Sequence, residues 1–346
     1  MNAEHLIRFL KGVGRKLALF VTIYLIASMA LFMAIRAIPG DPIALRLKNP
    51  DPVRVAKERE RLGLDKPVMT QYVLYGKSFW TGDWGRSLLS GRKVREDVAQ
   101  FFPATLELSL AGLSLGIIIG VLTAVFAEGF RSQWLKRFSF FLGTLGLTVP
   151  IFWIGLLALI VGSLWLGWFP SGGRFDLSMV PPPNVTGSLL IDSLLAGQWE
   201  KFWAAVNHLV LPAICLSLYP AAQVCSVLQA RLQDPKIEIL KRALKARGFG
   251  PARIWFRHLL KVGSAPVVTV IGTSFGALLG GAVLTETVFS WPGIGRYMVA
   301  AVLDRDLYVV QNVLLLVILL VVGVVFITDF LAHVINPVAT KSEEDQ

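Results

Sequence analysis

The sequence predicts an all-α polytopic membrane protein with six membrane-spanning helices. Of its 346 residues, 54% are hydrophobic and only 16% are charged, and the mean hydropathy is +0.62. Soluble proteins carry about 25% charged residues, so this composition excludes an ordinary soluble protein. A helix crosses the hydrocarbon core with about 20 apolar residues. Six runs of that length lie near residues 17–38, 104–127, 138–162, 208–229, 264–285 and 309–333.

The placement of positive charge predicts how the chain is oriented in the membrane. The net charge of +11 would suit a nucleic-acid partner, but most Lys and Arg residues lie beside the apolar runs. Lys and Arg accumulate in cytoplasmic segments, so we expect the lipid bilayer, and no nucleic acid, as their partner. Residues 1–16 are basic and predict a cytoplasmic N-terminus, and six spans return the tail, 334–346, to the same side.

The first span, 17–38, leads into a long outer segment. It lacks a small-x-small cleavage site, so we expect it to remain as a helix. It ends at the PGDP turn of residues 39–42, because Pro disrupts a helix interior. Residues 39–103 then form a periplasmic segment, in which 52–62 is predicted as an amphipathic helix. Turn residues around Asp83 and Arg86 favour a role in shaping the outer surface over substrate binding.

A second outer segment, 167–207, separates the third and fourth spans. Within it, residues 189–206 predict a surface helix, because aromatic residues such as Trp199 suit the membrane interface. The fourth span holds Cys215 and Cys225, ten residues apart. That spacing corresponds to about 15 Å of helical rise, too far for a disulfide, so we expect both cysteines to be packing residues.

The segment between the fourth and fifth spans is strongly basic and is central to the prediction. Ile237, Leu240 and Leu244 fall on one face of a helix. Glu238 precedes Arg242 by four residues, which is the favourable order for a helical ion pair. An amphipathic helix is therefore predicted here, on the cytoplasmic side of the membrane.

A glycine corner ends this helix. Gly supplies the left-handed stop and Pro suits the first turn of a helix, so the GFGP sequence at 248–251 predicts a break and a new start. The second helix is also basic, with Arg253, Arg257 and Lys261 spaced by four. The two helices predict a docking surface, although anionic lipid head groups would also suit a basic helix beside a membrane.

The fifth span is rich in small residues, which let helices approach closely. It contains Gly272, Gly276, Gly280 and Gly281, so we expect it to lie at the centre of the bundle.

Motifs of catalysis and of metal binding are absent from the sequence. It contains no phosphate-binding loop, no H-E-x-x-H, no paired Cys motif and no G-x-S-x-G. The four histidines have no partner at ligand spacing: His5, His208, His258 and His333. We therefore expect no metal site and no enzymatic activity in this chain. An intramembrane enzyme or a receptor that senses through 39–103 would need such a constellation.

Ionisable residues in the spans are few, which weakens the alternative of a proton-coupled secondary transporter. Glu107, Glu286 and Asp329 lie near span ends, and one of them would have to carry the coupling proton. A basic docking segment without an ATP site instead favours an external motor.

The basic segment between the fourth and fifth spans resembles a loop of a known protein family. The basic segment is similar to the "EAA" loop of ABC-importer permeases, with Ala243 and Gly248 at its small positions. The ending R-H-x-L…P at Arg257 to Pro266 is similar to the peptide-importer branch. Two residues depart from the pattern, because Arg242 replaces the usual Glu and Leu244 replaces a small residue.

Further short sequences resemble the dipeptide and oligopeptide branch of these permeases. They are PGDP at 39–42, LGL-x-x-P at 62–67 followed by Gln71-Tyr72, GDWGRS at 82–87, Pro103 with Thr105-Leu106, VPIFWIG at 149–155, LGWFPSGG at 166–173, HLVLP at 208–212, TETVFSWPGIG at 285–295, and Arg305-Asp306 with Val309, Val310 and Gln311. The tail departs, since Asn336-Pro337 stands where Asp-Pro is commoner.

The resemblance implies a type I ABC importer (MetI-like) permease fold in the bacterial inner membrane. Residues 104–333 would form a five-helix core, with a cytoplasmic coupling loop at 230–263. The implied partners are a second similar permease, two P-loop ATPase subunits that hold ATP and Mg²⁺, and a substrate-binding protein. This chain would bind no cofactor. Dipeptides or oligopeptides are the leading cargo, and glutathione and nickel chelates are alternatives within the branch.

The resemblance also implies which residues couple transport to ATP. Ala243 and Gly248 would permit close packing in a cleft of the ATPase, and Arg247 would meet acidic groups or lipid. Apolar contact would come from Leu240, Leu244 and Phe249.

A second set of candidate residues lies in the outer loops. The set comprises Asp83, Arg86, Glu286, Trp291, Pro292 and Gly293. The sequence at 291–293 is typical of a re-entrant corner over the pore mouth, and a gate that touches cargo is the alternative. The path itself is expected to be lined by small and polar groups of the third, fourth and fifth spans.

Overall fold

The computed structural model describes residues 3–37, 65–87, 90–129 and 132–335, together with residues 53 and 60. Several predicted features therefore lie outside the described residues. They are the PGDP turn, the amphipathic helix at 52–62, the LGL sequence at 62–64 and the tail from residue 336. Within the described ranges the chain is helical, with one isolated antiparallel bridge between Arg86 and Lys93.

Five helices of the described chain are long and apolar enough to cross a membrane, and a bent pair brings the total to six. This agrees with the predicted all-α fold with six spans. The five are α1 (Ala3–Arg36), α5 (Val94–Gly129), α9 (Trp199–Leu232), α12 (Leu260–Val288) and α14 (Leu307–Ile335). Shorter helices are α4 (Val68–Thr81), α8 (Leu189–Leu195), α10 (Pro235–Ala246), α11 (Pro251–Arg253), η2 (Ile254–Leu259) and α13 (Ile294–Leu303).

The predicted third span, 138–162, is not one straight helix. It is divided into α6 (Gln133–Thr148) and α7 (Ile151–Ala158), which continues as the π-helix η1 (Leu159–Trp165), and the two parts meet at 109°. Val149 has an extended backbone with φ −90° and ψ 129°, and Pro150 follows it. The break arises because a proline disfavours the helical conformation of the preceding residue.

The predicted boundary between a surface helix at 189–206 and the fourth span is also wrong. Helix α8 ends at residue 195, where Gly197 adopts a left-handed φ of +66°. Helix α9 then runs without a break from Trp199 through the fourth span, and it includes Pro212 and Pro220. Membrane helices tolerate such prolines because neighbouring groups satisfy the freed backbone carbonyls.

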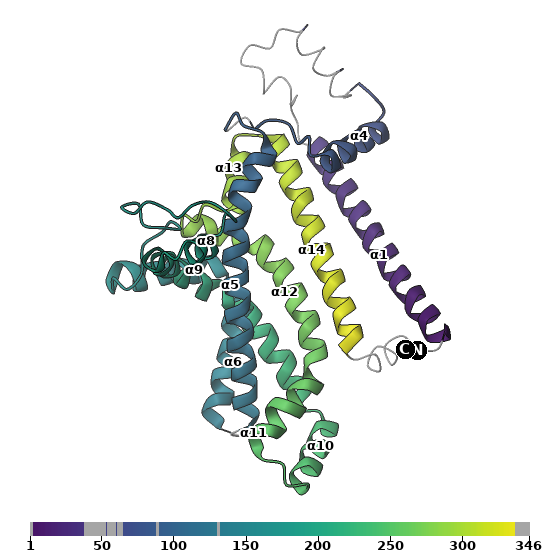
Figure 1. The fold of residues 1–346 in the computed structure, drawn as a ribbon, viewed down its shortest axis with the longest axis vertical. Helices are drawn as coiled ribbons and strands as arrows, with labels where there is room; N and C mark the ends of the chain where they lie inside the picture. The colour runs from purple at the N-terminus through teal and green to yellow at the C-terminus, as the bar shows by residue number, and fades with distance from the viewer. Residues whose placement is uncertain are drawn as a thin grey trace.

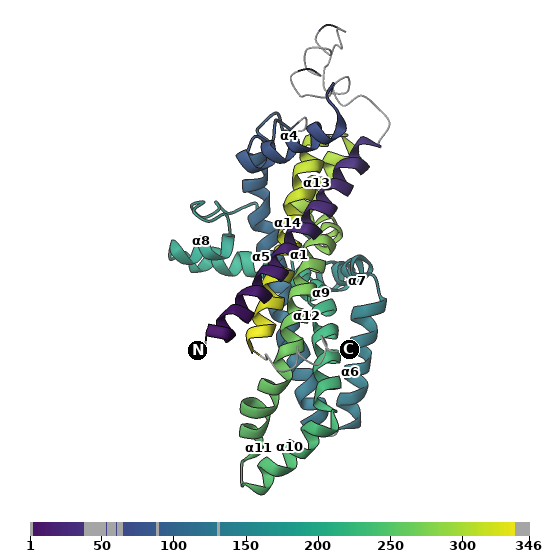
Figure 2. The same ribbon diagram turned by 90° about the vertical axis from the view of Figure 1, so that its right-hand side faces the viewer.

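Helices α5, α6, α12 and α14 run roughly along the long axis of the molecule, whereas α4 and α8 lie across it (Figure 1). Helices α10 and α11 form one end, and α4 and α13 lie toward the other, as the second view also shows (Figure 2). Helix α1 runs antiparallel to α14. The Lys16 Nζ atom donates to the backbone oxygen of Asp329 at 3.5 Å, and the rings of Phe20 and Phe326 are 5.4 Å apart. The described start of α1 and end of α14 therefore lie on the same side.

Helix α5 packs against α9 through glycines that the sequence analysis did not single out. A Cβ atom on Gly112 would lie 2.9 Å from the Leu216 side chain, and one on Gly116 would lie 2.5 Å from the Pro220 ring. At Gly120 the added atom would lie 2.7 Å from a backbone oxygen. The three glycines are spaced by four residues, so one face of α5 meets α9 with almost no side chain between the backbones.

The predicted glycine contacts of the fifth span are present in part. Gly272 and Gly276 of α12 meet Thr328 and Val321 of α14, where a Cβ atom would overlap the side chains. In contrast, the Cβ positions of Gly280 and Gly281 have no neighbour within 4 Å. Close packing within this chain therefore explains only the first two glycines.

Substitution of Gly116 by Ala should destabilise the chain. The added methyl group would overlap the Pro220 ring and the Ser217 carbonyl oxygen, and overpacking of this kind costs about 1–3 kcal/mol. The thermal unfolding midpoint of the detergent-purified protein measures the effect. Gly280→Ala is the matched control, because its methyl group would enter open space in a helix. Equal midpoints for the two variants would contradict the close contact.

Candidate functional site

The basic segment folds as a helix, a glycine corner and a second helix, in agreement with the sequence. The carboxylate of Asp234 accepts a hydrogen bond from the Lys236 N–H at 2.9 Å and so caps the start of α10. After the helix ends, Gly248 adopts a φ of +78°, a conformation that favours glycine. Pro251 begins α11, which continues through η2 into α12. The corner is thus continuous with the fifth span.

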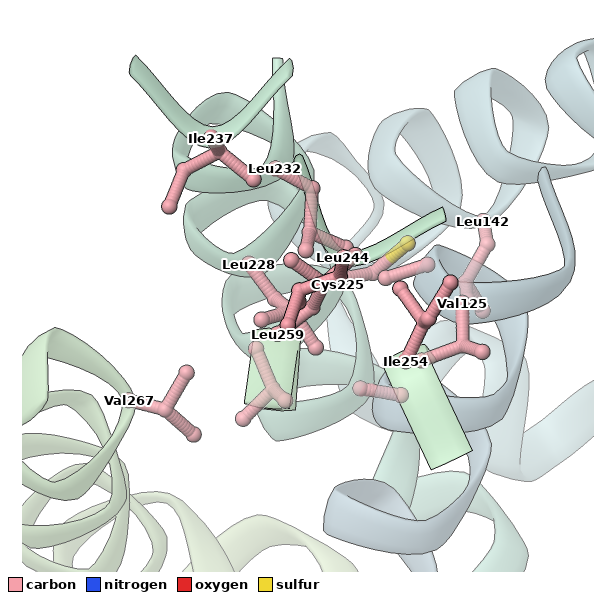
Figure 3. Close-up of a cluster of buried hydrophobic side chains, with 13 residues drawn as sticks. Val125, Leu142, Cys225, Leu228, Leu232, Ile237, Leu244, Ile254, Leu259 and Val267 are labelled. Carbon is pink, nitrogen blue, oxygen red and sulfur yellow. The ribbon is translucent and has the colours of Figure 1, made fainter. Parts of the chain in front are cut away.

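One face of α10 is buried against the spans (Figure 3). Ile237 and Leu244 are only 7% and 6% exposed. They belong to a cluster that draws side chains from α5, α6, α9, η2 and α12, including Val125, Leu142, Cys225, Leu228, Leu232, Ile254, Leu259 and Val267. Helix α10 is therefore packed directly against several of the spans.

The opposite face of α10 is exposed and carries small and basic residues. Ile239 is 67% exposed, and Ala243, Ala246 and Gly248 are exposed near it. No atom lies within 4 Å of the Cβ position of Gly248. The backbone at Gly248 is therefore accessible to another chain.

The structure separates the six coupling candidates into two groups. Ala243, Arg247 and Gly248 are exposed, whereas Leu240 and Phe249 are partly buried and pack on the inner cluster. Leu244 is buried in that cluster, so it cannot offer the apolar contact to a partner that the resemblance implied. The helical spacing of Ile237, Leu240 and Leu244 already indicated that Leu244 is buried, because the apolar face of an amphipathic helix packs against the protein core.

Ion pairs on α10 and a cation–π contact lie beside the glycine corner at Gly248. The Glu238 carboxylate lies 3.5 Å from Arg242 and 3.9 Å from Lys241, as the spacing predicted for the first pair. Exposed pairs of this kind contribute at most about 1 kcal/mol. The Arg253 guanidinium lies 5.6 Å from the centre of the Phe249 ring, so that ring joins the corner to the second helix.

At the other end of the molecule, Glu286 is fully buried and holds a second corner. Its carboxylate accepts hydrogen bonds from the Thr105 hydroxyl at 2.5 Å and from the Arg296 N–H at 2.8 Å. The indole of Trp291 donates to the Ala104 carbonyl oxygen at 2.9 Å. A carboxylate at the start of α13 also suits the positive end of that helix. These bonds hold the corner against α5.

The sequence signal for this corner was the WPG sequence. Trp291 and Gly293 are buried and Pro292 is exposed. Gly293 is required by contact, because a Cβ atom there would lie 2.2 Å from the Glu286 carboxylate. Sequence reasoning missed Thr105 as its partner, since 181 residues separate Thr105 from Glu286.

A second carboxylate, whose side chain is only 5% exposed, holds the loop between the third and fourth spans. Glu107 of α5 forms an ion pair with Arg174, whose Nε donates to it at 2.8 Å. The Ser188 hydroxyl and the Leu190 N–H donate to the other oxygen of Glu107 at 2.8 and 2.9 Å. The Arg174 guanidinium also lies 5.9 Å from the Trp291 ring centre, so loop and corner meet on α5.

Asp83 and Arg86 lie apart from this corner, in an exposed turn after α4. Gly85 has a φ of +74° and faces the Tyr308 ring, where a Cβ atom would lie 2.9 Å away. The Ser87 hydroxyl donates to the Asp306 carboxylate at 2.8 Å. The turn is therefore held against the start of α14.

The carboxylates and cysteines that could support proton coupling or other chemistry lie in structural contacts. Glu107 and Glu286 are occupied by the bonds above, and Cys215 and Cys225 are free and buried. Across the described residues, no group of three or more His, Cys, Asp or Glu side chains could hold a metal ion.

Comparison with known proteins decides the family. Residues 116–341 match the inner membrane component of binding-protein-dependent transport systems. Residues 6–109 match the N-terminal family of the membrane component of the same systems. The chain belongs to this family of transport permeases. It is therefore a multi-pass inner-membrane protein, and the predicted resemblance to ABC-importer permeases is confirmed.

Curated relatives resemble this permease over nearly its full length. The di/tripeptide transport system permease protein DppB of Pseudomonas aeruginosa is 40% identical over 330 residues, which cover 95% of this chain and 98% of that protein. The dipeptide transport system permease protein DppB of Alkalihalophilus pseudofirmus is 35% identical, with 93% and 97% covered. The glutathione transport system permease protein GsiC of Escherichia coli O1:K1 / APEC is 31% identical, with 94% and 97% covered.

Replacement of Thr105 by Val should loosen the corner at Trp291 in this permease. The variant keeps the side-chain shape but removes a hydrogen bond to a buried carboxylate, which contributes about 1.5–3 kcal/mol. It also removes the oxygen that accepts the Ile294 N–H at 2.8 Å. A lower unfolding midpoint of the purified protein is expected.

Thr273→Val is the control for this substitution. The Thr273 hydroxyl is exposed and bonds only to carbonyl oxygens of its own helix, at 3.1 and 3.4 Å. Its loss should leave the midpoint nearly unchanged. An equal effect of the two substitutions would show that Thr105 does not hold the corner.

Proposed function

We propose that this permease is one of the two membrane subunits of an ATP-driven importer for dipeptides or oligopeptides. A second, similar permease would complete the translocation path, and a binding protein would deliver the cargo to the outer loops. Two P-loop ATPase subunits would supply the energy. Membership of the binding-protein-dependent transport family is the observation that carries this proposal.

The exposed face of α10 supports the proposed contact with an ATPase subunit. Ala243 and Gly248 leave the backbone accessible, and Ile239 adds an apolar contact that replaces the buried Leu244. Arg242 and Arg247 are exposed and would meet acidic groups of the partner. In this scheme ATP-driven movement of the ATPases shifts α10, and the buried cluster beneath it passes the shift to the spans.

The orientation follows from this docking. The ATPases are cytoplasmic, so α10 and the basic loop would face the cytoplasm together with the start of α1 and the end of α14. The positive charge of residues 1–16 supports that orientation. The buried bonds of Glu286 and Glu107 would then close the periplasmic end of the chain.

The proposed cargo is inferred from the names of the relatives. Their names specify dipeptides, di/tripeptides and glutathione, which all consist of a few amino acids joined by amide bonds. We therefore propose short peptides as the substrate class of this permease as well.

Purification of the tagged chain from its native membrane in mild detergent tests the proposed assembly. Two P-loop ATPase subunits and a second six-span permease should co-purify. A homogeneous chain without any ATPase, under conditions that retain other ABC complexes from the same membrane, would contradict the assembly.

Substitution of Ala243 by Trp should abolish peptide uptake, with a loss of at least about tenfold. The bulky side chain would hold the ATPase away from the backbone of α10 while leaving the buried face intact. Gly248→Trp is a weaker test, because a φ of +78° strains any side chain at that position.

Ala196→Trp provides the matched control for Ala243→Trp. Ala196 is exposed and lies after α8, on the opposite side of the membrane in this orientation. Uptake by cells and the amount of inserted protein should be measured for both variants. Wild-type uptake by a well-inserted Ala243→Trp variant would contradict the docking role of α10.

A further inference from the structure

A groove of about 580 Å³ runs along α6 and α9 in the half of the molecule that carries α10 (Figure 2). Its lining extends along α6 from Lys136 to Thr148 and along α9 from Ala222 to Gln233. The span of α6 from Lys136 to Thr148 corresponds to about 18 Å of helical rise. One leaflet supplies about half of the hydrocarbon core, or about 15 Å. The groove is therefore about as long as one leaflet is deep.

Apolar side chains flank the open side of the groove. Phe140 is 77% exposed and Leu147 is 49% exposed, and both belong to the lining. The hydroxyls of Thr144 and Thr148 donate to carbonyl oxygens of their own helix at 2.9 and 2.5 Å. Because these hydroxyls already have acceptors, an apolar chain can lie beside them without leaving a polar group unpaired. The lining thus suits the acyl chain of a lipid.

Charges of both signs lie at the end of the groove nearest α10. Lys136 is exposed there, and the Glu128 carboxylate accepts a hydrogen bond from the Gln233 side chain at 2.8 Å. Trp134, two residues before Lys136, is 73% exposed. Tryptophan is enriched where a membrane meets water, so this end of the groove lies at the depth of lipid head groups.

One kind of phospholipid matches this charge pattern. The head group of phosphatidylethanolamine carries a phosphate and an ammonium, which complement the Lys136 ammonium and the Glu128 carboxylate through charge-assisted hydrogen bonds. Phosphatidylglycerol has the phosphate but no cation for Glu128. The charges, the depth and the length of the groove therefore all favour phosphatidylethanolamine.

We propose that this groove binds one phosphatidylethanolamine molecule from the leaflet on the α10 side. Its phosphate would meet Lys136, its ammonium would meet Glu128, and an acyl chain would lie along Phe140, Gly143 and Leu147. Both walls of the groove also contribute side chains to the cluster beneath α10, so the bound lipid would support the helices on which α10 packs. This inference depends neither on the cargo nor on the source of energy.

Photo-crosslinking tests the site in the full chain, purified with the subunits that accompany it. The protein is reconstituted into vesicles of equal amounts of phosphatidylethanolamine and phosphatidylglycerol. Parallel samples contain a trace of one lipid or the other with a diazirine on its acyl chain. Mass spectrometry then locates the adducts on the groove residues within 136–148 and 222–233. The exposed Leu19 and Ile26 of α1 report ordinary contact with lipid.

The unsubstituted chain should prefer phosphatidylethanolamine in the groove but not on α1. The yield of groove adducts, relative to those on α1, should be at least about tenfold higher for this lipid, because an additional charge-assisted hydrogen bond holds it. Glu128→Gln and Lys136→Gln should each lower the preference. Arg137→Gln is the control for Lys136→Gln, since Arg137 is an exposed neighbour outside the groove lining, and it should keep the preference.

Gly143→Leu should block the groove. No atom lies within 4 Å of the Cβ position of Gly143, so the added side chain would enter open space where this residue lines the groove. Gly76→Leu in α4 is the matched control, because its Cβ position is also open. Groove adducts should nearly disappear with Gly143→Leu and persist with Gly76→Leu.

An absence of groove adducts in the unsubstituted chain would overturn the inference, because another chain would then cover the groove. Equal relative yields of groove adducts for the two lipids would also overturn it, since the groove would make only ordinary contact with lipid. This comparison decides the question even if Gly143→Leu does not assemble. The crosslinking does not require transport, so failure of peptide uptake would count against the proposed function and leave the lipid site standing.

Discussion

The close approach of α5 to α9 is the constraint on which the rest of this permease depends. Helices in a bilayer gain no hydrophobic driving force from association, so van der Waals contact and hydrogen bonds hold them together. Gly112, Gly116 and Gly120 allow this contact along three successive turns of α5. A side chain at any of them would separate the two helices and, with them, the elements that each helix carries at its ends.

Helix α5 connects the two candidate sites. Toward its N-terminal end, Ala104, Thr105 and Glu107 hold the tryptophan corner and the loop of Arg174. Near its C-terminal end, Val125 contributes to the cluster beneath α10. In the proposed importer, a shift of α10 would reach α5 and α9 together, because both helices pack on the same buried side chains. The outer corner would respond because it is bonded to α5 itself.

Local sequence signals predicted the features that depend on neighbouring residues. The left-handed Gly248 and the pairing of Glu238 with Arg242 follow from backbone freedom and helical period. Hydropathy likewise located the spans, because each must be apolar over its whole length. The family resemblance added the exposed small residues of α10, which no local rule would have singled out.

Features that depend on distant contacts could not be predicted in the same way. The α5 glycines gain meaning only from the residues of α9 that face them, and Glu286 finds Thr105 across most of the chain. The bend at Pro150 was predictable in principle, since proline restricts the residue before it, but hydropathy averages over such a break. The burial of Leu244 was likewise implied by its helical face, but the family motif instead assigned this residue a contact with a partner.

The central claim is that ATP, and not a proton gradient, drives uptake through this permease. One measurement tests this directly. Uptake of a labelled dipeptide is followed in vesicles that contain the full complex and its binding protein, with ATP and with an uncoupler that abolishes the proton gradient. Uptake should continue under the uncoupler and stop when ATP is removed. Uptake that survives the loss of ATP and disappears with the gradient would contradict the importer and would implicate Glu107, Glu286 or Asp329 in proton coupling.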